Sequence, residues 1–183
     1  DGVLAIGAEA IQLTTRNCIG VTAGRLEFGE NDVSKPHGRF CPAGGPLFRY
    51  ANGNWRVRGR AVQASADVPL MQAAVRDASG PVSFSSTGGA FGAEANIEHA
   101  RLEDAAPQRR FNPIFLSGPA LLREGVWQAA VVGSDAAGRR LGEAQISHDI
   151  QSGVGEADID TGALTFADGG LQPATLSPLA ASL

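Results

Sequence analysis

Apolar and polar residues alternate in short segments along most of the chain. The clearest segment has one apolar and one polar series, namely Phe91, Ala93, Ala95 and Ile97 against Glu94, Asn96 and Glu98. Strict alternation predicts a β-strand with one apolar and one wet face. The turns between such segments are too short to contain helices, so we expect neighbouring strands to be antiparallel.

Residues 142–178 contain three such segments in succession. The positions that alternate there with polar residues, and so share one face of each strand, are Ile146, His148, Ile150, Ala157, Ile159, Leu164 and Phe166. A Gln-Ser-Gly turn separates the first two segments, and a Thr-Gly corner precedes the third. Nothing in this stretch has the arrangement of a catalytic device, and the pattern predicts a surface made of strands.

The same pattern recurs upstream of that stretch. Trp55, Val57, Gly59 and Ala61 form one face of a strand after an Asn-Gly hairpin turn at 51–54, and Trp127, Ala129 and Val131 form one face of another. Residues 69–78 favour a strand over a helical turn. Residues 29–45 are expected to be a loop and residues 103–126 mostly irregular, with a helical turn at Leu121 and Leu122.

Composition limits the class of protein. The 183 residues fit a single domain, or one segment of a longer repetitive sheet, over residues 1–183. A hydrophobic fraction of 43% with only 6% aromatic residues predicts a shallow apolar face. The net charge of −4 disfavours a nucleic-acid partner. The chain starts at Asp1, has no apolar run of about 18 residues and ends in an apolar tail, so we expect a piece of a longer protein.

Cys18 and Cys41 are the two cysteines of the chain. An isolated pair fits one disulfide better than a metal site, which needs two further ligands. A bridge contributes about 3 kcal/mol and implies an oxidising compartment such as a periplasm. The alternative is two buried free thiols.

No motif predicts catalysis, a metal or a cofactor. His148 and Asp149 are adjacent on a strand and therefore point to opposite faces, so they form no acid–base pair. Asp158 and Asp160 share a face but lack a third acidic ligand, which favours solvation. Arg56, Arg58 and Arg60 form either a phosphate-binding strip or a solvated strand face, and the second is favoured. We therefore expect no enzyme.

A sheet with one apolar face must hide that face. It packs against a second sheet, curls on itself, or holds an apolar ligand. A chain of ~16 carbons gains on the order of 12 kcal/mol in a dry groove, at about 0.8 kcal/mol per CH₂. An ordinary sandwich core produces the same pattern, so both possibilities stay open from the residues alone.

The chain resembles the YdbH family of alphaproteobacterial envelope proteins, in the AsmA-like group with TamB. The resemblance is carried by the order of three features, namely the early cysteines around FCPAGGPL, then RRFNP (residues 109–113), then ISHDIQSGVGEADIDTGALTFADGGLQP. We expect the family's N-terminal membrane anchor to belong to the longer protein from which this segment comes. The resemblance implies an all-β fold, a long and mostly antiparallel curled sheet (a β-taco or groove) with irregular loops and at most short helices.

The resemblance also implies a function. Such proteins are anchored in the inner membrane, extend through the periplasm and are thought to conduct phospholipids to the outer membrane along an apolar trough. The implied partners are phospholipid acyl chains, a YnbE-like outer-membrane lipoprotein that adds strands to an open edge, and a YdbL-like periplasmic protein. From strand parity, the expected groove residues are Phe91, Ile97, Trp127, Val131, Ile146, Ile150, Ile159, Leu164 and Phe166.

Two alternatives compete with lipid transport. The stronger is a structural or adhesive β-sandwich module of the cell envelope, held by one disulfide, with a closed core and no lipid. The weaker is a carbohydrate-binding or hydrolytic β-domain, for which Trp55 and Trp127 supply too few aromatic side chains.

Overall fold

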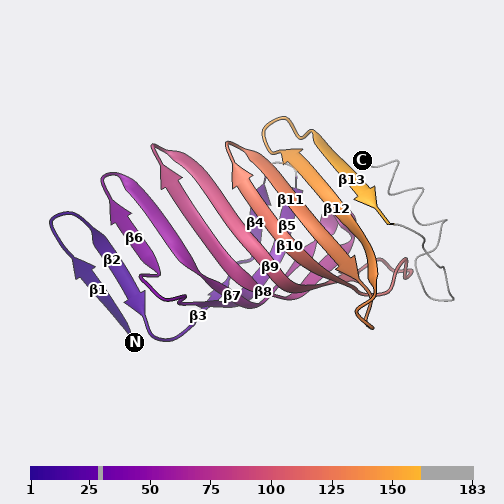
Figure 1. Cartoon of the computed structure of the whole chain (residues 1–183), viewed down its shortest axis with the longest axis horizontal. Helices are drawn as coiled ribbons and strands as arrows, with labels where there is room; N and C mark the ends of the chain where they lie inside the picture. Colours follow the sequence, from indigo (N-terminus) through magenta and orange to yellow (C-terminus); the bar gives the residue numbers. More distant parts are fainter. Residues whose placement is uncertain (29–30, 162–183) are drawn as a thin grey trace.

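The fold consists of β-strands joined by tight turns, with one turn of 3-10 helix (Figure 1). A computed structural model describes residues 1–28 and 31–161. The strands of this part are β1 (Gly2–Ile6), β2 (Ile11–Thr15), β3 (Ile19–Thr22), β4 (Arg25–Phe28), β5 (Asn31–Cys41), β6 (Phe48–Ala51), β7 (Asn54–Val68), β8 (Ala73–Thr87), β9 (Ala90–Asp104), β10 (Ile114–Arg123), β11 (Val126–Ser134), β12 (Arg140–Asp149) and β13 (Gly155–Asp160). The helical turn η1 (Pro69–Met71) joins β7 to β8.

All these strands belong to one antiparallel sheet. Its main path runs β1-β2-β6-β7-β8-β9-β10-β11-β12-β13, and β5 joins β7 while also pairing with β3 and β4. The long strand β7 has two different neighbours on the same edge. Residues 54–57 pair with β6, and residues 60–67 pair with β5. The sheet therefore divides at β7 into two walls. The first wall follows the main path from β1 to β13 and includes residues 54–61 of β7. The second wall contains β3, β4 and β5 together with the far halves of the long strands, namely residues 62–68 of β7, 73–79 of β8 and 98–104 of β9.

Among the residues that the structure describes, three hairpins close with two-residue turns of left-handed backbone. Their central residues, Asn52-Gly53, Gly88-Gly89 and Glu124-Gly125, all have positive φ angles between 51° and 86°. Turns of this left-handed conformation twist in the same sense as the strands they join. Each of the three turns contains at least one glycine, because glycine adopts positive φ angles without steric cost. The hairpin expected at 51–54 is present, since Ala51 pairs with Asn54.

The long strands bend where their ladders change register. Breaks occur in β5 near Lys35, in β7 near Gln63, in β8 near Asp77, and between β9 and β10 near Gly118. Lys35, Gln63 and Asp77 have φ angles of 50°, 53° and 55°. Because an extra residue on one strand kinks it and increases its twist, a row of such breaks across neighbouring strands bends the whole sheet.

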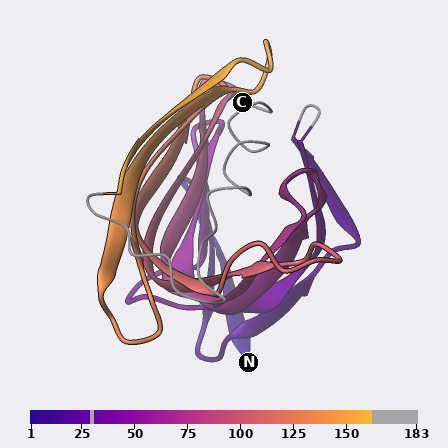
Figure 2. The same cartoon turned by 90° about the vertical axis from the view of Figure 1, so that its right-hand side faces the viewer.

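The bend gives the sheet the cross-section of an open trough. Seen from its C-terminal end, the wall with β11, β12 and β13 stands opposite the wall with β4 and β5, and the middle parts of the long strands join them below (Figure 2). The all-β, curled and mostly antiparallel fold expected for the chain is thus confirmed.

Two segments differ from the sequence-based expectation. Residues 31–41, expected as loop, form strand β5, and residues 114–123, expected as irregular with a helical turn, form strand β10. Residues 69–78 begin with η1 and continue as β8, so the strand expected there starts only at Ala73. The misleading features were Pro36, Gly38 and Gly118, which here accompany bulges within strands and do not end them.

Candidate functional site

One face of the sheet is apolar from one end to the other. Residues that pair directly across two strands lie on the same face of the sheet. The face of each residue can therefore be followed from strand to strand through the pairing register. Along the first wall this apolar face, hereafter the inner face, consists of Leu4, Ile6, Ile11, Leu13, Phe48, Tyr50, Trp55, Val57, Val82, Phe84, Phe91, Ala93, Ala95, Ala120, Leu122, Trp127, Ala129, Val131, Ala144, Ile146, Ala157 and Ile159.

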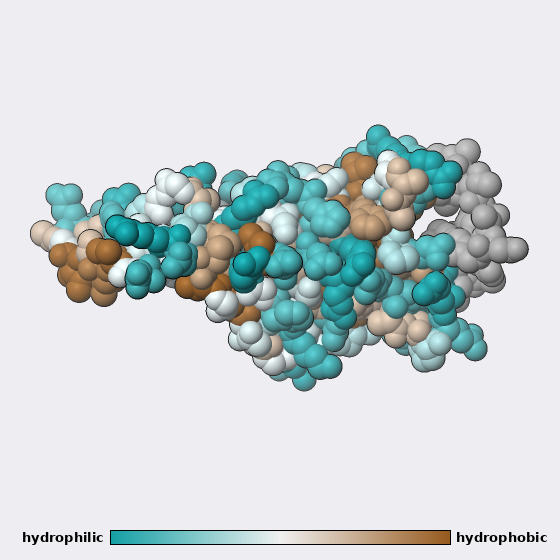
Figure 3. Space-filling model, turned by 90° about the horizontal axis from the view of Figure 1, so that it is seen from below, coloured by the Kyte–Doolittle hydropathy of each residue, from teal (hydrophilic) through white to brown (hydrophobic). Residues whose placement is uncertain are grey.

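The inner face lies on the concave side of the trough. The underside of the bend, which is its convex side, is largely hydrophilic when the molecule is seen from below (Figure 3). Ala93 and Leu122 of the apolar face are buried, whereas their neighbours Glu94 and Arg123 on the other face are exposed. Both observations assign the apolar face to the inside of the trough.

The inner face is solvent-accessible. Of the large apolar side chains that are exposed in the described residues, all but Val3, Leu70, Met71 and Val154 lie on this face. Phe91 is 45% exposed, Ile146 41% and Ile159 57%. Extended apolar surface of this kind is rare on a soluble monomer and is typical of faces that contact protein, membrane or an apolar ligand.

No second layer covers this face within the described residues. Apart from η1, the strands contact one another substantially only as ladder neighbours. Burial is correspondingly shallow, and most of the deeply buried apolar residues are alanines such as Ala73, Ala74, Ala93 and Ala100. A closed sandwich core would bury large side chains between two sheets, and the described part of the chain has no such arrangement.

The predicted groove residues divide into three groups. Register places Phe91, Ile97, Trp127, Val131, Ile146 and Ile159 together on the inner face. Ile150 lies beyond the end of β12, in the turn to β13, where its amide donates to the Gly125 carbonyl oxygen at 2.9 Å, so its assignment to a strand was wrong. Leu164 and Phe166 lie outside the described residues.

Sequence reasoning missed the inner face of the second wall. Ile19 and Val21 of β3, Leu26 of β4 and Phe40 of β5 share this face through their pairing with β5 and β7. Ile19, Val21 and Leu26 are 42%, 50% and 42% exposed. Leu26 alternates with Arg25 and Glu27 in the sequence, which indicates a strand. The connection of this wall to the rest of the sheet runs through β5, however, and the sequence of β5 resembles a loop.

A disulfide joins Cys18 to Cys41, which are separated by 23 residues. Cys41 is the last residue of β5, and Cys18 directly precedes β3. The bridge therefore fastens the start of the edge strand β3 to the strand that carries it. A loop of this length is worth about 3 kcal/mol of stability in the chain-entropy picture.

The outer face is polar. Seen from below, the underside of the bend is largely hydrophilic, and hydrophobic surface gathers at the end formed by β1 and β2 (Figure 3). Val3, Leu4 and Ile6 of β1 are 67%, 58% and 74% exposed. Strand β1 thus combines apolar residues on both faces with an edge that pairs only with β2.

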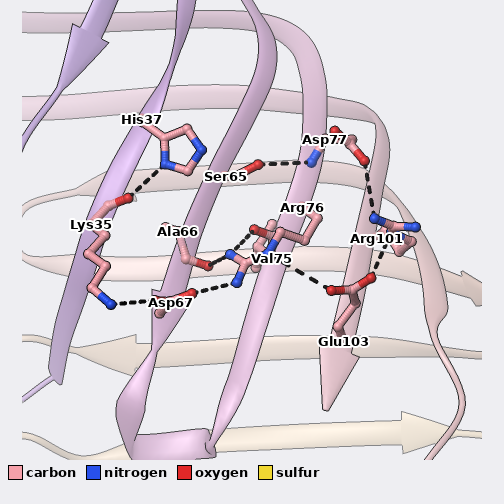
Figure 4. A network of polar contacts seen from close by, with 10 residues as sticks. All are labelled: Lys35, His37, Ser65, Ala66, Asp67, Val75, Arg76, Asp77, Arg101 and Glu103. Atoms are coloured by element: carbon pink, nitrogen blue, oxygen red, sulfur yellow. Dashed lines mark hydrogen bonds and ion pairs between the residues drawn. The ribbon is translucent and has the colours of Figure 1, made fainter. Parts of the chain in front are cut away.

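A network of charged groups covers the outer face of the second wall (Figure 4). Arg76 pairs with Asp67 at 2.6 Å, and Arg101 pairs with Glu103 at 3.1 Å. The hydrogen bond from Arg76 lowers the pKa of the Asp67 carboxyl. The network keeps this surface wet while the opposite face of the same strands stays apolar.

A second charged cluster anchors the loop between β9 and β10. Burial of the Asp104 carboxyl opposes its ionisation, but hydrogen bonds from Arg110 and from the Ala106 amide outweigh that effect and hold its pKa at about 2. The Arg110 guanidinium also donates to the carbonyl oxygens of Met71 and Gln72 at 2.8 and 2.9 Å. The RRFNP motif therefore attaches its loop to η1.

Membrane-spanning helices and clusters of metal ligands are both absent from the part of the chain that the structure describes. Within residues 1–28 and 31–161 no helix is long and apolar enough to cross a membrane, and no group of three or more His, Cys, Asp or Glu side chains is arranged to hold a metal ion. Comparison with protein families, with curated proteins and with solved structures finds no match for this chain.

Proposed function

We propose that this chain is a segment of a β-sheet trough that conducts phospholipids, with acyl chains lying against the inner face and headgroups in water. The observation that carries the proposal is the collection of exposed large apolar side chains on one concave face, from Ile6 at one end to Ile159 at the other. A passive surface of this kind needs no catalytic group.

The energetic scale supports a lipid ligand. An acyl chain of ~16 carbons gains on the order of 12 kcal/mol when it leaves water completely, at about 0.8 kcal/mol per CH₂. An open trough covers only part of the acyl chain, so the lipid gains only a fraction of that free energy. Partial burial suits a conduit, because a lipid that moves along the face must also leave it.

The compartment and partners proposed for the chain come from the family resemblance. We infer a periplasmic location, with the full-length protein anchored in the inner membrane, a YnbE-like lipoprotein adding strands to an open edge and a YdbL-like protein assisting. The disulfide suits an oxidising compartment. Strand addition suits an edge such as β1, which pairs on one side only in the described sheet.

Site-specific photocrosslinking tests the proposal directly. A photoreactive residue at Ile146 faces the trough, whereas one at the adjacent Ser147 faces outward, although the two share a strand and a local backbone. In cells that express the full-length protein, we expect lipid adducts from position 146 and few from position 147. The same contrast is expected for Phe91 against Glu94.

Substitution separates a groove from a closed core. Ile146→Glu is expected to reduce lipid adducts at Phe91 while the circular dichroism spectrum keeps its β-sheet form. Ser147→Glu, the matched control, is expected to change neither. Adducts of equal yield from both faces, or none from any inner position, would contradict lipid transport.

A structural module of the cell envelope is the second candidate function. The disulfide favours it, since such bridges stabilise secreted domains whose cores are small. In that case the inner face is covered permanently by protein. Inner-face crosslinkers would then yield protein adducts only, and Ile146→Glu would unfold the domain.

A further inference from the structure

Three arginines form a patch on the outer face of β6 and β7. Arg49 and Arg56 are direct cross-strand partners, and Arg58 follows Arg56 on the same face. All three are exposed. On the adjacent strand β8, Ser85 pairs with Arg56 and Ser83 pairs with Arg58, so hydroxyl groups flank the guanidinium groups. The patch (Arg49, Arg56, Arg58) thus lies on the opposite side of the sheet from the inner face.

These arginines differ from most other cations in the described residues. Ion pairs with carboxylates hold Arg25, Lys35, Arg60, Arg76, Arg101, Arg110, Arg123, Arg139 and Arg140. The side chains of the patch make no ion pair and no hydrogen bond with any described residue. Like charges directly opposite each other destabilise a sheet. A cluster that tolerates this repulsion without an internal counterion is arranged to receive one from outside.

A depression of about 480 Å³ accompanies the patch. Arg49 and Arg56 line it together with Ser83, Ser85 and Thr87. Glu94 also lines it, but this carboxylate pairs with Arg123 at 2.9 Å and so does not neutralise the patch. The depression therefore combines positive charge with several hydroxyl donors on an open polar surface.

We propose that the arginine patch binds phosphate groups, presented by an anionic phospholipid headgroup or by a free phosphomonoester. The planar guanidinium donates paired hydrogen bonds to two oxygens of one phosphate, and serine and threonine hydroxyls donate to the others. A free phosphomonoester, which is largely a dianion at neutral pH, also neutralises more of the clustered charge than a single carboxylate does, whereas the phosphodiester of a lipid headgroup brings one negative charge. This site is independent of the inner face, so its failure and that of lipid conduction are distinguishable.

Binding measurements with two probes test the site. Inorganic phosphate is titrated into the protein by calorimetry, and vesicles of phosphatidylglycerol or phosphatidylcholine are tested by co-sedimentation. We expect the Arg49→Gln/Arg56→Gln/Arg58→Gln variant to bind at least one anionic probe roughly tenfold more weakly than the unmodified chain, because it loses the guanidinium forks. Phosphatidylcholine vesicles, which carry no net charge, are expected to bind neither protein.

The matched control is Arg25→Gln/Arg139→Gln/Arg140→Gln. This variant loses the same charge, but its arginines are engaged with Asp32, Asp135 and Glu143, none of which lines the depression. We expect it to bind within about twofold of the unmodified chain. Phosphate binding without vesicle binding assigns a free phosphomonoester, and vesicle binding without phosphate binding assigns a headgroup. Equal weakening of both variants, or no binding of either anionic probe, would overturn the proposal.

Discussion

At the scale of single residues, polar side chains hold the loops while apolar ones stay uncovered. Asp104, whose side chain is only 3% exposed, accepts hydrogen bonds from Arg110 and from the Ala106 amide. Arg110 in turn stands 5.7 Å from the centre of the Phe111 ring, which is 9% exposed and among the few buried aromatics. These contacts lie around η1 and the loop between β9 and β10. Neither segment pairs with a strand, so side-chain contacts hold them in place.

Acid titration tests the Asp104 anchor. Its folded pKa of about 2 lies below the ordinary aspartate value of 3.8, so the ionised carboxyl stabilises the fold above pH ~4, and this contribution disappears as the pH falls towards 2. We expect Asp104→Asn to lower the free energy of unfolding at pH 7 by on the order of 2 kcal/mol, with the difference shrinking between pH 4 and pH 2.

Urea unfolding at several pH values measures this difference. Asp158→Asn provides the control, because Asp158 is exposed on the edge strand β13 and should leave the stability nearly unchanged. A constant gap between Asp104→Asn and the unmodified chain from pH 7 to pH 2 would show that the Asp104 carboxylate contributes nothing through its charge.

At the scale of strands, the bends determine the shape. Gly80 of β8 lies at a register break with a φ angle of 155°, and a Cβ there would overlap the carbonyl oxygen of Asn96 on β9. Gly118 of β10 has a φ angle of 141°, and a Cβ there would overlap the carbonyl oxygen of Ala130. Close approach of neighbouring backbones at these two points requires glycine.

Substitution of Gly80 tests the importance of the bend. We expect Gly80→Ala to lower the free energy of unfolding by about 2 kcal/mol or more, since both the overlap and the unusual φ angle oppose a side chain. Gly20→Ala on β3 is the control, because a Cβ at Gly20 meets nothing within 4 Å. Denaturant unfolding compares the two variants. Equal free energies of unfolding for Gly80→Ala and Gly20→Ala would show that the bend at Gly80 accommodates a side chain and does not require glycine.

Alternation within strands was predictable from the sequence, and the bends between the walls were not. The faces of β7, β9, β11 and β12 follow directly from their two-residue period. The bulges do not, because Lys35, Gln63 and Asp77 are not glycines and yet adopt left-handed angles that only the surrounding ladders impose. Pro36 and Gly38 consequently made β5 resemble a loop, which hid the second wall and its apolar residues.

At the scale of the whole molecule, the polarity of the two faces is the defining feature. The outer face carries the charged network around Arg76 and the arginine patch of β6 and β7, whereas the inner face exposes Phe84, Phe91 and Ile146. Leaving such side chains in water costs much of the free energy that folding normally recovers by burial. The proposed acyl-chain ligand would cover this surface and recover part of that free energy.

Tryptophan fluorescence tests the proposed acyl-chain contact most directly, because both tryptophans of the chain, Trp55 and Trp127, lie on the inner face. The unmodified protein is mixed with short-chain phospholipids whose acyl chains carry bromine, a contact-range quencher, or with the same lipids without bromine. We expect emission to fall with the brominated lipid alone, and to fall less in Ile146→Glu than in Ser147→Glu. Equal emission with both lipids would contradict acyl-chain contact with the inner face.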